Sequence, residues 1–190
     1  MNYGETLAYW YLRLNGFIPM RNFVLHRANI EGQAAADTDL LAVRFPNVYE
    51  EIGGQPPDWD NHRFEDWGLD LCNNIALVVE VKTGRINPDR RWWRRERLQA
   101  AVLRLGMIDR GQVPEIVADL EQAPAVQVGS WTIAKLLVTD QLLEDDSWFN
   151  LTLADADGFI IERIVSYKGD KRADRLRFPD DLMQYLAWKS

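Results

Sequence analysis

The stretch from residue 75 to residue 84 constrains the fold of this chain more than any other. Residues 75–79 are all apolar, which is typical of a strand buried on both faces of a sheet. Two charged residues, Glu80 and Lys82, follow at the end of this strand. Because side chains alternate along a strand, both point to the same face. Charges at the end of a buried strand are costly unless they are paired or bind a metal, so this pair indicates a site.

A second apolar strand, predicted over residues 39–45, supplies another charged group, because Asp39 stands at its start. If the two strands pair antiparallel, the start of one lies beside the end of the other. Asp39 would then meet Glu80 and Lys82 at one edge of the sheet. Asp37 would point to the same face as Asp39, but it lies outside the apolar run, so Asp39 is the preferred candidate.

Two carboxylates and one amine at one sheet edge suit the chemistry of a divalent metal. Mg²⁺ binds oxygen ligands, usually one or two carboxylates together with waters and substrate phosphates. A nearby amine can orient or deprotonate an attacking water, or stabilise developing negative charge. The alternative is an unrelated α/β protein in which Glu80 and Lys82 form a structural ion pair, and Asp39 would then lie far from Glu80.

The pattern of an Asp opening one apolar strand and Glu-x-Lys closing the next resembles that of the PD-(D/E)XK, or restriction-endonuclease-like, nucleases. A Glu on a preceding helix often completes the family pattern. Here Glu5 lies in the first turn of a helix predicted over residues 3–14. In that turn Glu5 also suits the positive end of the helix dipole, which is the alternative role for it. The resemblance covers roughly residues 3–106.

The resemblance implies an α/β fold with a restriction-endonuclease-like core, in which helices flank a central mixed sheet of four to five strands. It also implies an endonuclease that uses Mg²⁺ or Mn²⁺ to hydrolyse phosphodiester bonds, with DNA as the expected substrate and RNA as the alternative. Asp39, Glu80 and the main-chain carbonyl of Val81 would hold the metal, and Lys82 and Glu5 would complete the catalytic set.

The resemblance further implies a homodimer, since small nucleases of this kind often pair to cut both strands. The alternative function is a catalytically inactive module with the same fold that binds a protein or nucleic-acid partner. In that case the acidic insert at residues 46–74 would contact the partner. A structureless loop of this length is uncommon, so we expect the insert to be functional or partly ordered.

An arginine-rich segment follows Lys82, at the start of a helix predicted from residues 87–89 to a stop at Gly106. Its arginines extend the apolar face of the helix backwards and alternate with tryptophans. Arg binds phosphate in a bidentate fork and Trp stacks on bases, so the segment predicts contact with nucleic acid. The alternatives are a solvated charged face, or salt bridges to the insert or to a second subunit. The expected nucleic-acid-binding residues are Arg91, Arg94, Arg95 and Gln99.

Gln99 is included because RecB-like members of the family carry a Gln-x-x-x-Tyr motif at about this place. The motif is half complete here, since Leu103 stands where the Tyr is expected. The net charge of −7 does not favour indiscriminate binding to nucleic acid. The charge is unevenly distributed, because residues 50–70 hold seven acids and residues 85–97 hold six arginines.

At 190 residues, the chain is expected to form a single domain over residues 1–190. Two His and one Cys cannot build a His/Cys zinc site, which argues against zinc-dependent nuclease chemistry. The single cysteine, Cys72, fits a reducing compartment. No apolar run reaches about 18 residues and the N-terminus lacks a signal sequence, so we expect a cytoplasmic protein without a membrane partner. Further elements are predicted as strands over residues 17–27 and 131–139, and as helices over residues 113–120, 159–167 and 179–188.

Overall fold

The apolar run at residues 75–79 forms the centre of the sheet. It belongs to β3 (Asn74–Lys82), which is buried at every position between its two ends. β3 pairs antiparallel with β2 (Ala36–Arg44) and parallel with β5 (Trp131–Thr139). A strand with neighbours on both sides and helices over both faces has no solvated side, which explains its continuous apolar sequence. The structure is a computed structural model and describes residues 2–25, 36–84, 95–143, 145–167 and 178–189.

Six strands form one mixed sheet in the order β1-β2-β3-β5-β4, and β6 also pairs with β5. β1 (Ile18–Leu25) lies antiparallel to β2. β4 (Ala125–Val128) runs antiparallel along the first half of β5, and β6 (Phe149–Thr152) runs parallel along its second half. The expectation of four to five strands is therefore wrong. β4 and β6 have four residues each, too few to show a recognisable alternation in the sequence.

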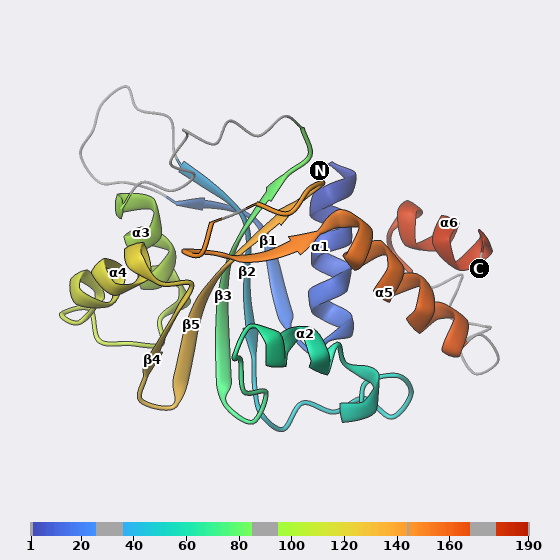
Figure 1. Ribbon diagram of the computed structural model, residues 1–190, viewed down its shortest axis with the longest axis horizontal. Helices are drawn as coiled ribbons and strands as arrows, with labels where there is room; N and C mark the ends of the chain where they lie inside the picture. The colour runs from blue at the N-terminus through green and yellow to red at the C-terminus, as the bar shows by residue number, and fades with distance from the viewer. Residues whose placement is uncertain (1, 26–35, 85–94, 144, 168–177, 190) are drawn as a thin grey trace.

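Helices cover both faces of the sheet, as expected for an α/β protein (Figure 1). On one side lie α1 (Tyr3–Leu14), α5 (Leu153–Ser166) and α6 (Asp181–Lys189). On the other side lie α3 (Arg95–Leu105) and α4 (Val113–Gln122). None of the helices in the described ranges has the length and apolar character needed to cross a membrane.

The alternation of side chains along β3 assigns its residues to two hydrophobic cores. Val79 and Val81 pack in the core that includes α1. Val78 packs in the core formed with α3 and α4. Since the side-chain period of a strand is two, Glu80 and Lys82 continue the face of Val78. The charged pair therefore lies on the side of the sheet that α3 covers.

The insert at residues 46–74 is an ordered part of the fold. It contains the short 3₁₀ helix η1 (Pro56–Asp58) and the helix α2 (Asn61–Asp66). Phe64 and Leu69 bury their side chains in the core on the α1 side of the sheet. The burial of these side chains explains how a segment rich in Pro and Gly holds one position in the fold.

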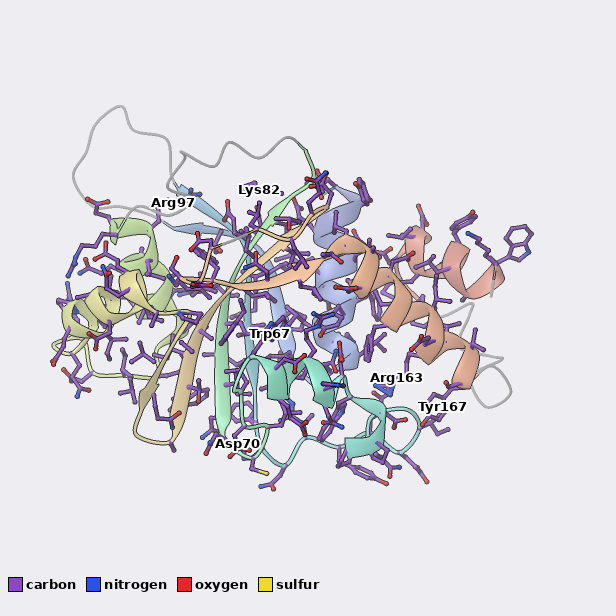
Figure 2. All side chains as sticks on the ribbon, viewed as in Figure 1. Trp67, Asp70, Lys82, Arg97, Arg163 and Tyr167 are labelled. Atoms are coloured by element: carbon purple, nitrogen blue, oxygen red, sulfur yellow. The ribbon has the colours of Figure 1, made fainter. Side chains whose placement is uncertain are left out.

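Acidic side chains of the insert bind other parts of the same chain. The hydroxyl of Tyr11 donates a hydrogen bond of 2.8 Å to Asp60 Oδ2. Asp58 Oδ1 lies 3.4 Å from Nη1 of the buried Arg163 on α5. The insert lies at the end of the sheet opposite to Lys82, so its acids do not take part in the charged cluster there (Figure 2).

Several predicted elements match the structure, and others differ at their boundaries. The helix over residues 3–14 and the strand over 131–139 are confirmed, as is the helix stop at Gly106, which has a φ of 69°. α5 begins at Leu153 and not at residue 159, because the Thr152 side chain caps it by accepting a hydrogen bond from Asp155 N. The predicted helix start at residues 87–89 lies outside the described residues.

Candidate functional site

The antiparallel pairing of β2 and β3 brings Asp39, Glu80 and Lys82 together. The last paired residues of the two strands at this end are Leu40 and Val79, so Asp39 lies beside Glu80. Lys82 Nζ lies 3.6 Å from Asp39 Oδ2 and donates a hydrogen bond to Glu80 Oε1. The alternative in which Asp39 lies far from Glu80 therefore does not hold.

The sequence predicted that Asp39 is the first residue of its strand, and this prediction is wrong. β2 begins at Ala36, because residues 36–38 continue the pairing with β1 even though they are not part of the apolar run. Asp39 lies at the edge of the site because the pairing of β2 with β3 ends at Leu40, the residue that follows Asp39 in the chain. The rival candidate Asp37 lies in the same strand, opposite Val24 of β1.

Side-chain hydrogen bonds replace backbone pairing between β2 and β3 at the site. Asp39 Oδ2 accepts a bond of 2.7 Å from Val81 N, and Thr38 Oγ1 donates a bond of 3.5 Å to the carbonyl of Val79. These bonds fix the carboxyl group of Asp39 against the end of β3. Asp39 Oδ1 accepts no hydrogen bond from the described residues, so it remains available to a ligand.

Glu80 is the most buried of the three charged side chains, with 5% of its surface exposed, against 23% for Asp39 and 31% for Lys82. Burial raises the pKa of the Glu80 carboxyl group, and the negative charge of Asp39 raises it further. The positive charges of Lys82 and Arg97 act in the opposite direction on this pKa. Because the pKa is raised on balance, the surrounding charges do not fully stabilise the anionic form of Glu80. This favours the binding of a further cation.

Arg97 is a member of this cluster that the sequence did not assign to it. It lies on α3, on the side of the sheet that carries Glu80, and its charge acts on the Glu80 carboxylate (Figure 2). Its position four residues before the buried Ala101 placed it next to the apolar face of the helix. This spacing is the feature of the sequence that could have indicated Arg97. The angle at which α3 docks on the sheet decides which arginine lies close enough to act on Glu80.

Glu5 lies in the first turn of α1, where its carboxylate accepts a hydrogen bond of 2.9 Å from the Asn2 side chain. The same Asn2 caps the helix by accepting a bond from Glu5 N. Within the described ranges, no hydrogen bond or ion pair joins Glu5 to Asp39, Glu80 or Lys82. The contacts of Glu5 therefore correspond to its role at the helix start, and its part in catalysis stays a prediction.

The first turn of α1 nevertheless packs directly against the end of β3. A Cβ atom added at Gly4 would overlap Thr83 Cγ2 and come within 3.1 Å of Val81 Cγ1. We expect Gly4→Ala to destabilise the protein by about 1 to 2 kcal/mol, because this overlap outweighs the helix propensity that Ala adds. Chemical denaturation measures the change.

The double variant Gly4→Ala/Thr83→Ser tests the cause of this loss. Serine lacks the methyl group that the added Cβ meets but keeps the hydroxyl group, so most of the lost stability should return. A Gly4→Ala variant as stable as the parent would contradict the close approach of α1 to β3. A double variant no more stable than Gly4→Ala alone would show that Thr83 is not the obstacle.

The expected nucleic-acid-binding residues are only partly described. Arg91 and Arg94 lie outside the described residues. The exposed Arg95 donates a hydrogen bond of 2.6 Å to Glu121 of α4 and one of 3.0 Å to the carbonyl of Pro114, so it joins α3 to α4. Gln99 is half-buried on α3 and makes no side-chain hydrogen bond within the described chain. Contact of these four residues with nucleic acid stays a prediction.

The donor set of the site fits a hard divalent cation. Asp39 and Glu80 supply carboxylate oxygens, and the carbonyl of Val81 lies beside them, 3.2 Å from Lys82 Nζ. No cluster of three or more Asp, Glu, His or Cys side chains is placed to share a metal in the part of the chain that the structure describes. Mg²⁺ often takes only one or two carboxylates and completes its shell with waters, so two carboxylates and a carbonyl are sufficient.

The end of β3 also lies at the carboxyl end of a parallel pair. Lys82 is the register partner of Thr139, the last residue of β5. Ligands of open α/β sheets bind at the carboxyl ends of strands, so this is the expected place for a site. No family model, no curated protein and no solved structure matches this chain. The description of the fold and of the charged cluster therefore depends on the geometry alone.

Proposed function

We propose that this protein is a metal-dependent endonuclease of the PD-(D/E)XK type that hydrolyses phosphodiester bonds, with DNA as its substrate. The observation that carries the proposal is the convergence of Asp39, Glu80 and Lys82 at the splayed end of β2 and β3. Support also comes from the order of elements, in which a helix precedes three strands and a further helix follows the Glu-x-Lys strand. This order agrees with the resemblance noted in the sequence.

In the proposed site, Asp39, Glu80 and the Val81 carbonyl would hold Mg²⁺ or Mn²⁺. Such an ion, when bound, lowers the pKa of a coordinated water and offsets charge on the phosphoryl oxygens. The bond from Val81 N to Oδ2 would hold the Asp39 carboxylate in place for this role, while Oδ1 accepts no hydrogen bond from the described residues. Glu80 supplies a buried carboxylate whose charge is only partly offset by the neighbouring cations Lys82 and Arg97.

Lys82 has two tasks in this proposal. Its ammonium group contacts both carboxylates in the described structure and so offsets part of their charge. During reaction, Lys82 Nζ would orient the attacking water for in-line displacement and stabilise the negative charge that develops on the phosphate. Arg97, on the facing helix, would attract the phosphate into the same place. Arg91, Arg94, Arg95 and Gln99 would contact the nucleic-acid backbone.

We extend the proposal to a cytoplasmic enzyme that cuts duplex DNA as a homodimer. The test is a cleavage assay on plasmid, linear and single-stranded DNA and on RNA, with Mg²⁺, with Mn²⁺ and with a chelator. We expect cleavage that requires the divalent ion and stops when the chelator is added. Absence of cleavage, together with no heat of Mn²⁺ binding in calorimetry, would instead support the inactive binding module.

The raised pKa of Glu80 predicts how metal affinity depends on pH. A metal can bind this carboxylate only after its proton leaves, and the raised pKa keeps the proton bound to a higher pH than in an ordinary Glu. Affinity for Mn²⁺ should therefore fall as the pH falls through the pKa of Glu80, by about tenfold per pH unit below it. Calorimetry from about pH 4, near the ordinary pKa of a glutamate carboxyl group, up to about pH 8 measures this dependence.

A matched control separates this carboxylate from the rest of the protein. Glu115 is exposed on α4, away from the site, and Glu115→Gln should leave the pH dependence of Mn²⁺ binding unchanged. Binding that is equally tight at every pH in this range would show that Glu80 is not a ligand.

A further inference from the structure

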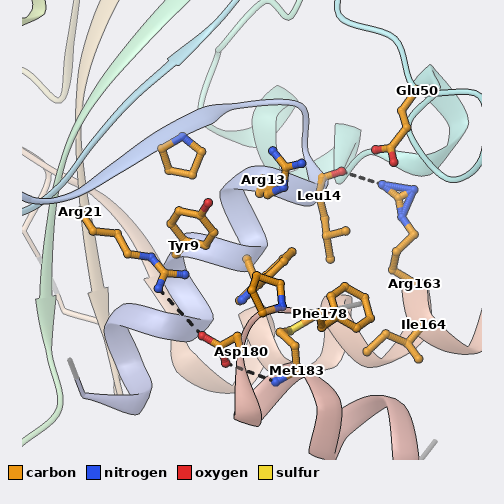
Figure 3. A pocket seen from close by; sticks show the side chains of 13 residues that line it. Tyr9, Arg13, Leu14, Arg21, Glu50, Arg163, Ile164, Phe178, Asp180 and Met183 are labelled. Carbon is orange, nitrogen blue, oxygen red and sulfur yellow. Dashed lines mark hydrogen bonds and ion pairs between the residues drawn. The ribbon is translucent and has the colours of Figure 1, made fainter. Parts of the chain in front are cut away.

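A cavity of about 700 Å³ opens on the side of the sheet opposite to the charged cluster. It is bounded by α1, β1, α5 and α6, and by Glu50 of the insert (Figure 3). None of its wall residues belongs to the proposed nuclease site. Much of the wall is apolar, formed by Trp10, Leu14, Pro19, Ile164, Phe178 and Met183. A cavity of this size with an apolar wall and a few polar groups is typical of small-molecule sites.

Three guanidinium groups and two carboxylates complete the wall. Arg21 lies 3.4 Å over the ring of Tyr9, and its Nη1 lies 3.9 Å from Asp180 Oδ2. Arg13, in the last turn of α1, is exposed and makes no hydrogen bond or ion pair within the described chain. Among the described residues that line the cavity, three arginines face two acids, and Arg13 is an exposed cation without a partner in the described chain.

Two further donors in the wall are buried and have no acceptor among the residues that the structure describes. Arg163 is 6% exposed and donates a hydrogen bond of 2.7 Å from Nη2 to the carbonyl of Leu14, but its Nε donates none. The indole Nε1 of Trp10, also 6% exposed, donates none either. Buried donors are nearly always satisfied, so these two atoms call for an acceptor. An oxygen of a ligand that displaces the neighbouring side chains slightly would provide it.

We propose that this cavity binds a small organic anion with a flat aromatic body, such as a nucleoside monophosphate or an aromatic carboxylate. The apolar wall accommodates the ring system, and the ring faces and edges of Trp10 and Phe178 suit an aromatic partner. The buried donors of Arg163 and Trp10 require an acceptor, and the exposed guanidinium of Arg13 can attract an anion, since guanidinium binds carboxylate and phosphate alike. This proposal does not depend on nuclease activity.

Calorimetric titration of the intact protein tests the proposal with two anionic probes, adenosine monophosphate and indole-3-acetate. Each is compared with its uncharged counterpart, adenosine or indole-3-acetamide, and with inorganic phosphate or acetate as the bare anion. We expect at least one aromatic anion to bind about tenfold or more tightly than both its counterpart and the bare anion. The two probes distinguish a phosphate from a carboxylate ligand.

Arg13→Gln should weaken binding of that probe by about fivefold or more, the loss expected for one charged hydrogen-bonding group. The matched control is Arg110→Gln, which removes the same charge from an exposed residue between α3 and α4 and should change nothing. Glu80→Gln should bind the probe as the parent does, which keeps this test separate from the nuclease proposal. The inference is overturned if neither anion binds, if the uncharged counterpart binds equally well, or if Arg13→Gln has parental affinity.

Discussion

Replacing Glu80 with Gln is expected to reduce metal-dependent cleavage by about 10³-fold or more while making the protein more stable. The loss of activity is expected because Glu80 is one of the two carboxylates that would hold the metal. Each electrostatic group in such a site contributes strongly to stabilisation of the transition state. The gain in stability follows from the raised pKa of Glu80. Cleavage rates and chemical denaturation of the two proteins measure the two effects.

The direction of the stability change can be derived from proton linkage. Because the native pKa of Glu80 lies above its value in the unfolded chain, the native state binds more protons in the pH window between the two values. The free energy of unfolding therefore falls as the pH rises through that window, and the deficit persists at neutral pH. Glutamine removes it, so we expect a gain of about 0.5 to 2 kcal/mol, the usual range for a single stabilising change.

Two comparisons make the Glu80 result specific. Glu115→Gln removes an exposed carboxylate of the same type and should leave both cleavage and stability near parental values. Lys82→Ala should also abolish cleavage, since it removes the amine that contacts both carboxylates, but it lacks the stabilising effect. If Glu80→Gln and Lys82→Ala both cleave DNA as fast as the parent, this cluster is not an active site.

The largest loss of stability is expected from Arg44→Ala. Arg44 is fully buried in β2, at the end of the sheet away from Lys82. Its Nε donates a hydrogen bond of 3.0 Å to the carbonyl of Asn15, its Nη1 donates one of 2.7 Å to the carbonyl of Leu71, and its guanidinium lies 4.2 Å from the ring centre of Trp59. One side chain thus ties the end of α1 to the insert. Burial lowers the pKa of Arg44 to about 10, so it remains charged at neutral pH.

Alanine at position 44 would leave two carbonyl groups without their donors and a void where the guanidinium stood. We expect a loss of about 3 to 5 kcal/mol in the free energy of unfolding, measured by urea denaturation. The stability of Arg44→Lys should lie between those of the parent and Arg44→Ala. An ammonium group keeps the charge but lacks the forked guanidinium that bonds both carbonyls. Arg110→Ala, at an exposed position, is the control and should cost less than about 0.5 kcal/mol. A loss for Arg44→Ala as small as that of the control would contradict this role.

The cluster of Asp39, Glu80 and Lys82 could be predicted from sequence because each inference used a rule with few exceptions. The period of two along a strand placed Glu80 and Lys82 on one face, and antiparallel pairing placed Asp39 beside them. The start of β2 was missed because Asp37 and Thr38 interrupt the apolar run, although their backbones still pair with β1. Local polarity therefore did not mark the boundary of the strand, and Thr38 is fully buried although it is polar.

Features that depend on how elements dock could not be derived from the sequence. The short strands β4 and β6 form because each pairs with one half of the same edge of β5. Their own four residues are too few to show an alternation of polar and apolar side chains. The effect of Arg97 on Glu80 likewise depends on how α3 lies across the sheet. In the sequence, Arg44 is simply a residue near the end of an apolar strand. Its role in joining the end of α1 to the insert is visible only in the folded protein.

The ammonium group of Lys82, held between two acids, gives this edge of the sheet a built-in counter-ion. Lys82 therefore offsets part of the mutual repulsion of Asp39 and Glu80 when no divalent ion is present. If the site takes a divalent ion, as proposed, that ion would replace the Lys82 ammonium group as the counter-charge of the two carboxylates. Occupancy of the site would follow the free concentration of the ion from moment to moment, independently of how and when the chain was synthesised.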